Sequence, residues 1–314
     1  MKGKIAILGA GHVGSHVDSA LAAGQICEEV VLIGRTEDRP RGQAADISDA
    51  LSFPPNPVIV RPGVYEDCAD ADITIVAIGK TRVQGQTRLD MLDDSVRMVH
   101  EMTEKLNHTG VSDLVISITN PCDIIADCIR KALKMDRFHC FGTGTLLDTA
   151  RLIKILSQQT ASPRNSIEAF VLGEHGDSSM IPYSWLKIGG RPAAEAEGFD
   201  AEEALRRTHT SGMDIIKGKG WPEFGIGQCM AYLAKAILED HKVTLPLSVL
   251  LEGEYGIEGT HCGVPCTVGR NGIEEICELP LTDEEMQKLR ESAETIRRHC
   301  QRADKVFASC VSKE

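Results

Sequence analysis

The sequence predicts an α/β protein, in which a Rossmann-type, doubly wound parallel sheet is followed by an α+β domain. Short apolar, β-branched runs alternate with helical stretches up to about residue 142, a pattern typical of βαβ units. These runs are apolar throughout, as expected of strands covered by helices on both faces. A glycine-rich turn directly after the first run strengthens the prediction. The pattern changes after residue 142, so we expect two domains, over residues 1–142 and 143–314.

The expected elements follow one another along the chain. In the first domain we predict strands at residues 4–8, 29–33, 72–78 and 113–118, and helices at 12–24, 41–52, 87–107 and 122–134. In the second domain we predict strand-like pieces at 167–172 and 243–251, and helices at 145–158, 201–217, 226–239 and 282–305. We find no repeat, low-complexity segment or long linker, so the two domains should pack tightly.

The charge balance limits the possible partners. The chain of 314 residues carries 46 acidic and 34 basic residues, a net charge of −12. This balance argues against a surface for nucleic acid or for an anionic membrane. No apolar run approaches the ~18–20 residues that cross a bilayer. Anionic small molecules remain possible, because a few arginines in a cleft act locally.

The 11 cysteines are scattered along the chain. Cys262 and Cys266 have the spacing of loose zinc ligands, but no second Cys or His pair lies at a finger-like distance. We therefore expect no metal site, and free thiols in a reducing cytoplasm.

The turn GAGHVG, residues 9–14, fits the pattern G-x-G-x-x-G between a strand and a helix. Gly9 permits the tight turn, Gly11 lets a pyrophosphate approach the backbone, and Gly14 lets the helix pack closely on the strand. The N-terminus of the helix then faces the phosphates. A dinucleotide-binding site is therefore expected, with further contacts from His12, Val13, Tyr65, Gly79, Ile118 and Asn120.

The second strand ends in VVLIGRTEDR, residues 30–39, without the acidic residue that holds an adenosine ribose. Gly34 stands at that tip, and Arg35 and Arg39 supply positive charge that attracts a 2′-phosphate. We therefore expect the cofactor to be NAD or NADP, with NADP accepted alongside NAD. Glu37 and Asp38, just downstream, would weaken the effect.

Two segments at strand ends carry candidate substrate ligands. GKTRVQGQTR, residues 79–88, holds Arg82 and Arg88 in a stretch with two glycines, which suits a loop that closes over an anion. A solvated basic loop is the alternative. TNPCD, residues 119–123, offers the amide of Asn120, and Pro121 follows either a trans bond, the default, or a cis bond.

Two further segments supply acid–base chemistry. In GTGTLLDTAR, Asp148 and Arg151 are three residues apart and share one face of a helix, either as a surface ion pair or in a cleft. In VLGEHGDS, His175 follows an apolar run and has Asp148 as a candidate partner. A structural histidine is the alternative to an acid/base.

With these motifs in this order, the chain resembles the L-lactate/L-malate dehydrogenase superfamily nearly end to end, from GAGHVG through GQTRLDML to LEGEYG and GVPCTVGRNGIEEI. The resemblance implies that residues 143–314 form the catalytic domain, with His175 as proton donor and acceptor, oriented by Asp148. Arg151 would hold the C1 carboxylate of the substrate. Arg88 would polarise its carbonyl group, and Asn120 would bond the reacting oxygen. The family also forms homodimers and homotetramers.

Two departures from the lactate pattern bear on the substrate. Arg82 stands where lactate enzymes carry Gln, and in the family an Arg there marks malate enzymes. KGWPEF replaces KGYT, which puts Trp221 and Pro222 near the substrate wall.

The leading interpretation is a malate dehydrogenase that uses NAD(P). The alternative is a lactate or another L-2-hydroxy acid dehydrogenase of the hydroxyisocaproate type. Two other classes of protein are alternatives. NAD-dependent glycosidases share the fold but need a metal held by Cys and His. A non-catalytic nucleotide sensor should lack one of Asp148, Arg151 or His175, and this chain has all three.

Overall fold

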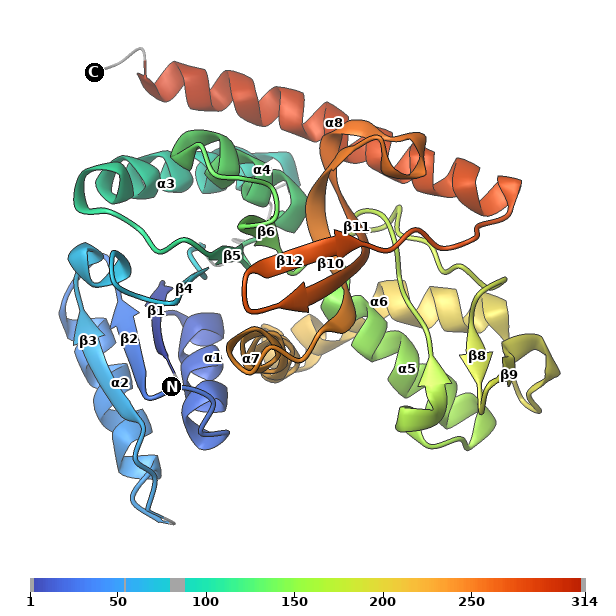
Figure 1. Cartoon of the computed structure of the whole chain (residues 1–314), viewed down its shortest axis with the longest axis horizontal. Coiled ribbons are helices and arrows are strands. Elements are labelled where there is room, and N and C mark those ends of the chain that lie inside the picture. The colour runs from blue at the N-terminus through green and yellow to red at the C-terminus, as the bar shows by residue number, and fades with distance from the viewer. Residues whose placement is uncertain (1–2, 54, 80–87, 312–314) are drawn as a thin grey trace.

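A nine-stranded sheet runs through the middle of the protein, with helices on both faces (Figure 1). The computed structural model describes residues 3–53, 55–79 and 88–311, with the backbone alone at 88–91 and 311. The strand order is β12-β11-β10-β6-β5-β4-β1-β2-β3. Strands β1 to β6 are parallel, and their order is that of a Rossmann fold. The predicted fold class is therefore confirmed.

The parallel half begins with the predicted strands. They are β1 (Lys4–Leu8), β2 (Glu29–Ile33), β4 (Ile73–Val76) and β5 (Val115–Ser117). The first domain also has the predicted helices, α1 (His12–Ala23), α2 (Asp38–Ala50), α3 (Arg88–Thr109) and α4 (Cys122–Leu133). Each apolar run is buried because helices cover both faces of the sheet.

Two strands of this half were not predicted. β3 (Ile59–Gly63) is an edge strand that pairs only with β2. Its sequence IVRPG contains a proline and leaves Ile59 and Pro62 exposed, so it lacks the continuous apolar pattern of a central strand. β6 (Cys140–Gly142) has only three residues, too few for a periodic signal.

The sheet continues without a break into the second half of the chain. Ser248 of β10 (Val243–Glu252) pairs with Gly142 of β6, and β11 (Glu258–Gly269) and β12 (Gly272–Ile276) follow as antiparallel neighbours. β11 and β12 were not predicted, because Gly263 and Pro265 interrupt the apolar pattern of β11. β11 forms instead by antiparallel pairing with β10, in which Pro265 lies opposite Pro246.

The second half adds its own helices and a small separate sheet. The helices are α5 (Leu146–Thr160), α6 (Ala201–Lys219), α7 (Phe224–Leu238) and α8 (Asp283–Val311). β7 (Ile167–Glu168), β8 (Lys187–Ile188) and β9 (Arg191–Pro192) form a three-stranded sheet. The predicted strand at 167–172 is thus shorter than expected. α8 packs on α3, α4 and β11 and so spans both halves of the chain.

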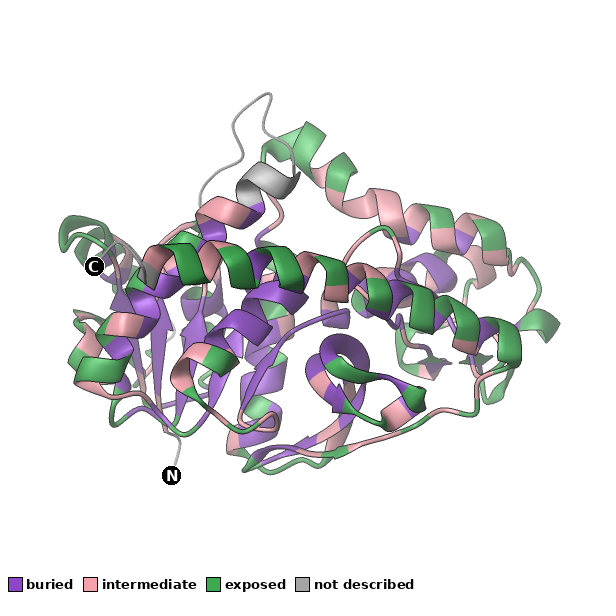
Figure 2. Ribbon diagram, turned by 90° about the horizontal axis from the view of Figure 1, so that it is seen from above, coloured by how far each residue is buried: buried purple, intermediate pink, exposed green. Residues whose placement is uncertain are grey.

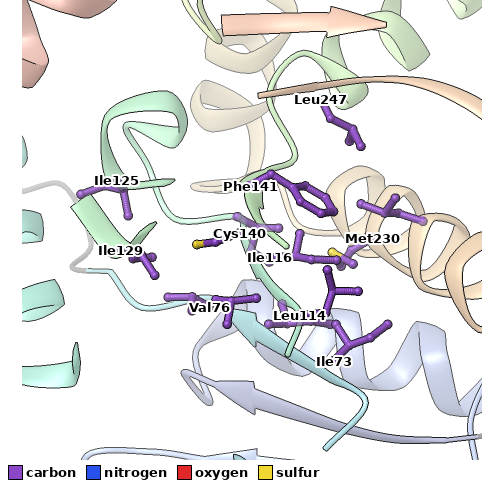
Figure 3. Packing of buried hydrophobic residues seen from close by; sticks show 14 of the residues in the cluster. Ile73, Val76, Leu114, Ile116, Ile125, Ile129, Cys140, Phe141, Met230 and Leu247 are labelled. Atoms are coloured by element: carbon purple, nitrogen blue, oxygen red, sulfur yellow. The ribbon is translucent and has the colours of Figure 1, made fainter. Parts of the chain in front are cut away.

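The main core lies where the central strands meet the helices. Ile73, Ile116 and Phe141 belong to three neighbouring strands, and Ile125 of α4 and Met230 of α7 pack with them (Figure 3). Buried residues fill the strands, while the outer faces of the helices are exposed (Figure 2). This continuous core fixes α7 of the second half of the chain against α1 of the first half.

One buried carboxyl group in this region has no partner. Asp18 of α1 is fully buried, and neither carboxyl oxygen has a hydrogen-bond partner among the described residues. Burial raises the pKa of Asp18 from 3.8 to about 8, because an apolar environment disfavours the charged form. The folded protein therefore holds a proton there that the unfolded chain has released at neutral pH.

We predict that this group makes the protein less stable as pH rises. The pKa of Asp18 is raised in the folded state, so the stability that this group contributes is fully present below pH 3.8. This contribution is lost as pH rises to about 8, at ~1.4 kcal/mol for each pH unit. Asp18→Asn should remove this dependence, measured by urea unfolding across the same range. Asp46→Asn, on the exposed face of α2, is the control. Equal pH profiles for the native protein and Asp18→Asn would contradict the prediction.

Candidate functional site

A cavity of about 400 Å³ opens between the parallel strands and α3. It is lined by residues at the carboxyl ends of β1, β2 and β4, where the strand order reverses and α/β sheets bind ligands. Of the expected cofactor ligands, seven line it: Gly9, Gly11, Gly34, Arg35, Arg39, Tyr65 and Gly79. The others, His12, Val13, Gly14, Ile118 and Asn120, do not border this cavity.

The glycine-rich turn has the geometry that a dinucleotide needs. Gly9 has φ +121°, and a Cβ there would lie 2.3 Å from the carbonyl oxygen of Ala77. A Cβ at Gly14 would lie 1.8 Å from the oxygen of Gly9. Among the residues that the structure describes, none has an atom within 4 Å of a Cβ at Gly11, and no side chain of theirs caps the N-terminus of α1. The first amide groups of α1 are therefore accessible to a phosphate.

The tip of β2 gives Gly34 a second explanation. We interpreted Gly34 as the absence of an acidic residue that would repel a 2′-phosphate, and a Cβ at this position would also lie 2.6 Å from Cγ of Pro40. The glycine thus has a packing reason that is independent of any phosphate. Arg35 and Arg39 are exposed and border the cavity. Glu37 and Asp38 pair instead with Arg41, so the downstream acids do not neutralise these two arginines.

Sequence reasoning missed the contribution of α3 to this cavity. Glu101 and Lys105 border it, and the ammonium group of Lys105 lies 5.0 Å from the ring centroid of Tyr65. Their spacing of four residues on one helix face was the available signal. Lys105 adds a third positive charge to Arg35 and Arg39, and Glu101 adds one negative charge.

The second group of candidates converges in the other half of the chain. Asp148 lies in the first turn of α5, and Arg151 follows one turn later on the same face. His175 lies in the turn after Gly173, whose backbone is paired with Gly263 of β11. Nδ1 of His175 lies 2.6 Å from Oδ2 of Asp148, and Arg151 donates to Oδ1 at 2.9 Å. The predicted partnership of these three residues therefore exists in the structure.

Charge controls the protonation of this triad. The negative charge of Asp148 raises the pKa of His175 above its ordinary value, against the opposing effect of burial. Burial disfavours ionisation of Asp148, but His175 and Arg151 outweigh it and hold the pKa of Asp148 below its usual range. The ionised carboxylate accepts from Nδ1–H, so Nε2 is the ring nitrogen available to a ligand.

The unused donors of Arg151 suit an anionic ligand. Its side chain is only 12% exposed, and its Nε–H has no partner among the described residues. Asp148 is one carboxylate between two cations, Arg151 and protonated His175. The three side chains therefore carry a net charge of +1, and a bound carboxylate would balance it.

Asp123 also contacts this site, and sequence reasoning passed over it. It lies at the start of α4, fully buried, and its Oδ2 accepts the backbone N–H of His175 at 2.8 Å. Burial raises the pKa of its carboxyl group, and its hydrogen bond fixes the backbone of the His175 turn. Its place within TNPCD was a signal that we did not use.

The remaining candidates come from other segments of the chain. The Asn120–Pro121 bond is cis, which was the less expected of the two forms, and Asn120 is exposed. Trp221 and Pro222 are half-buried between α6 and α7. Arg82 lies outside the described residues. Arg88 begins α3, but its side chain also lies outside them.

Other candidate sites are absent from the part of the chain that the structure describes. No group of three His, Cys, Asp or Glu residues is placed there to hold a metal ion. Cys262 and Cys266 are buried free thiols on β11. No helix in the described segments is both long and apolar enough to cross a membrane.

Comparisons with known proteins agree with this geometry. Residues 3–142 match the model of the lactate/malate dehydrogenase NAD binding domain, and residues 145–306 match that of the lactate/malate dehydrogenase α/β C-terminal domain. The chain is 35% identical over 308 residues to L-lactate dehydrogenase 1 of Bifidobacterium longum, covering 96% of this chain and 98% of that one.

Two solved structures have the same fold. A lactate dehydrogenase from a Medee basin deep-sea metagenome superimposes with a TM-score of 0.92 at 27% identity, covering 97% of this chain and 100% of that one. The malate dehydrogenase of Aeropyrum pernix gives a TM-score of 0.90 at 30% identity, with coverage of 95% and 97%. The structural likeness alone therefore does not separate lactate from malate.

We predict that Asp148→Asn lowers the pKa of His175. The asparagine keeps the shape of the side chain but removes the negative charge that favours the protonated ring. The measurement is a pH titration of carbon-13-labelled histidine rings by NMR, with the His175 signal assigned from a His175→Gln spectrum. Asp136→Asn, beside the exposed His139, is the control. An unchanged His175 titration in Asp148→Asn would refute the electrostatic account.

Proposed function

The chain belongs to the lactate/malate dehydrogenase family, and on this premise we propose that it interconverts a small 2-oxo acid and its L-2-hydroxy acid. The observation that carries the proposal is the contact of His175 with Asp148, which also holds Arg151. When bound, the nicotinamide of NAD(H) supplies or accepts the hydride. The side chains of this site supply the proton and hold the substrate.

His175 is the acid/base of the proposed reaction. Asp148 holds Nδ1–H, so the proton on Nε2 is the one that passes to the substrate oxygen during reduction and returns during oxidation. The raised pKa of His175, caused by the charge of Asp148, favours retention of this proton. Asp123 holds the backbone of the same residue, so neither the position nor the tautomer of the ring is left free.

Arg151 binds the substrate carboxylate. A carboxylate fits the planar donor edge of a guanidinium with two hydrogen bonds, and Arg151 uses one nitrogen on Asp148. The net charge of the triad is neutralised by one carboxylate, which favours a monocarboxylate such as pyruvate unless another cation joins the site.

Between the two main substrate classes, we favour pyruvate and L-lactate. The relatives at 33–37% identity are named L-lactate dehydrogenases, and the sequence-based preference for malate has no support among them. Arg82 is the specific observation that keeps oxaloacetate and L-malate as the second candidate, since a second substrate carboxylate needs a further cation. Trp221 and Pro222 alter the substrate wall relative to the family pattern and would serve either acid, or a bulkier one.

NAD(H) is the cofactor that the family model supports, and we propose that NADP(H) is accepted as well. Arg35, Arg39 and Lys105 border the cavity at the end that would hold the adenosine. Their charges favour a 2′-phosphate, and Glu101 opposes it.

We also propose a homo-oligomer, either a dimer or a tetramer, in the cytoplasm. Large apolar side chains are exposed on neighbouring helices, namely Met213 and Ile216 of α6 and Phe224 and Tyr232 of α7. A face of this kind is typical of a subunit interface, and the free thiols agree with a reducing compartment.

We predict that His175→Ala lowers turnover by ~10²–10⁴-fold, the usual contribution of a general acid–base. Steady-state reduction of pyruvate and of oxaloacetate with NADH is the measurement. His139→Ala, an exposed histidine paired with Asp136, should retain native turnover. If His175→Ala also retained it, the proposed role of this residue would be wrong.

Arg82 is expected to decide between the two acids. We predict that Arg82→Gln lowers the catalytic efficiency with oxaloacetate and raises it with pyruvate. The ratio of the oxaloacetate efficiency to the pyruvate efficiency should fall tenfold or more, because ~1.4 kcal/mol of lost ion pairing corresponds to tenfold. Native protein and variant are compared with oxaloacetate, pyruvate and 2-oxoisocaproate. A ratio that does not change would remove Arg82 from the substrate site and leave Trp221 and Pro222 as the determinants.

The cofactor proposal predicts that NADPH is used with at least about one tenth of the efficiency of NADH, since an exposed ion pair contributes ~1 kcal/mol or less. Arg35→Gln should lower the NADPH efficiency about fivefold and leave NADH nearly unchanged. Arg206→Gln, an exposed arginine of α6 that pairs with Glu203 away from the cavity, is the control. Gly34→Asp is unsuitable because of the contact with Pro40. The absence of NADPH activity in the native enzyme would contradict the proposal.

A further inference from the structure

The segment between α6 and α7, residues 220–223, lies against the first turn of α1. The indole of Trp221 stacks on the ring of His12, with centroids 3.9 Å apart and an interplanar angle of 28°. His12 directly follows Gly11, where α1 begins. The segment that we expect at the substrate wall therefore touches the turn that is expected to receive the cofactor phosphates.

A buried carboxylate holds this contact together. Glu223 is 7% exposed, and its Oε1 accepts from the ammonium group of Lys219 at the end of α6. Its Oε2 lies 3.7 Å from Nδ1 of His12 and 3.7 Å from Nδ1 of His16. Oε2 has no hydrogen-bond partner among the described residues. His16 donates from Nδ1 to the carbonyl of His12, so the ring of His16 is itself fixed on α1.

Electrostatics favour the charged form of this carboxylate despite its burial. Burial alone would disfavour ionisation, but the hydrogen bond from Lys219 and the charges of His16, Lys219 and His12 hold the pKa of Glu223 below its usual range. An ionised carboxylate inside a contact between two elements stabilises it only while its cationic neighbours stay in place. Glu223 thus ties the end of α6 to the start of α1.

The same helices reach the catalytic group. Gly212 of α6 lies beside the guanidinium of Arg151, where an added Cβ would come within 3.5 Å of a terminal nitrogen. Gly225 of α7 lies beside Leu147, the neighbour of Asp148 in the first turn of α5. The segment 220–223, which contacts the first turn of α1, is therefore flanked by two helices that contact α5 beside Asp148 and Arg151.

We propose that Glu223 is a positioning residue for the reaction, and that it couples cofactor binding to the substrate wall. This inference rests on the proposed function. Glu223 holds Trp221 on His12, so a dinucleotide that orders the first turn of α1 also orders Trp221 and Pro222. The 2-oxo acid then meets a wall that the cofactor has already fixed. Coupling between two sites in proteins is usually about 5- to 150-fold in affinity.

The first test measures Trp221 directly. The chain has two tryptophans, so Trp185→Phe leaves Trp221 as the only indole, and acrylamide quenching of its emission reports its accessibility. Saturating NAD⁺ should lower the quenching constant of this protein at least twofold. Adding Glu223→Gln should raise the constant and abolish the response to NAD⁺. Adding Glu203→Gln, which removes a partner of Arg206 on α6, should leave the quenching constant and its response to NAD⁺ unchanged. An unchanged response to NAD⁺ in Glu223→Gln would overturn the proposal.

The second test separates positioning from folding. Glu223→Gln should raise the KM for the 2-oxo acid at least fivefold, the lower end of usual couplings, with kcat changed less than threefold. His16→Asn, which leaves Glu223 and Lys219 in place, should give a smaller rise in KM and guards against a general loss of structure. A lower melting temperature with an unchanged KM would mean a purely structural role and overturn the proposal. If no 2-oxo acid is reduced by the native protein while Trp221 still responds to NAD⁺ through Glu223, the proposed function fails and this coupling stands.

Discussion

The candidate active site depends on one carboxylate that is shared by two cations. Asp148 binds His175 through one oxygen and Arg151 through the other, and this single interaction sets the tautomer of the histidine, its charge and the orientation of the guanidinium. Because two positive groups share one negative group, the site has positive charge left for an organic acid. Removing Asp148 would therefore affect proton transfer and substrate binding together.

The rest of the fold brings that carboxylate to its partners. Asp148 comes from α5, the His175 turn is held by Asp123 of α4 and by pairing with β11, and α6 passes beside Arg151. The continuous nine-stranded sheet keeps these second-half elements in register with the Rossmann half. The cavity beside the glycine-rich turn and the His175 site thus lie along one continuous sheet, and the segment 220–223 contacts the first turn of α1.

The sequence predicted best what depends on local spacing. Asp148 and Arg151 share a face because they are three residues apart on a helix, and the glycine turn follows from its strand–turn–helix context. Non-local effects were missed. β3 and β11 form because of the strands beside them, and their own patterns are broken by proline or glycine. Gly34 was read as a mark of the cofactor, yet Pro40 packs against it from α2. The contacts of Glu223 with α1 join residues some two hundred positions apart, and no motif announces them.

The central claim is that protonated His175, stabilised by Asp148, receives the substrate anion beside Arg151. Calorimetric titration of the protein–NADH complex with oxamate, an amide analogue of pyruvate that cannot accept a hydride, measures it directly when repeated in buffers of different ionisation enthalpy. From about pH 6 to about pH 9, proton uptake on binding should rise from near zero towards one proton per site, because the anion favours the charged ring as its pKa is passed. Uptake should disappear in His175→Gln. Binding without proton uptake across this range, or equal uptake in the variant, would contradict the account.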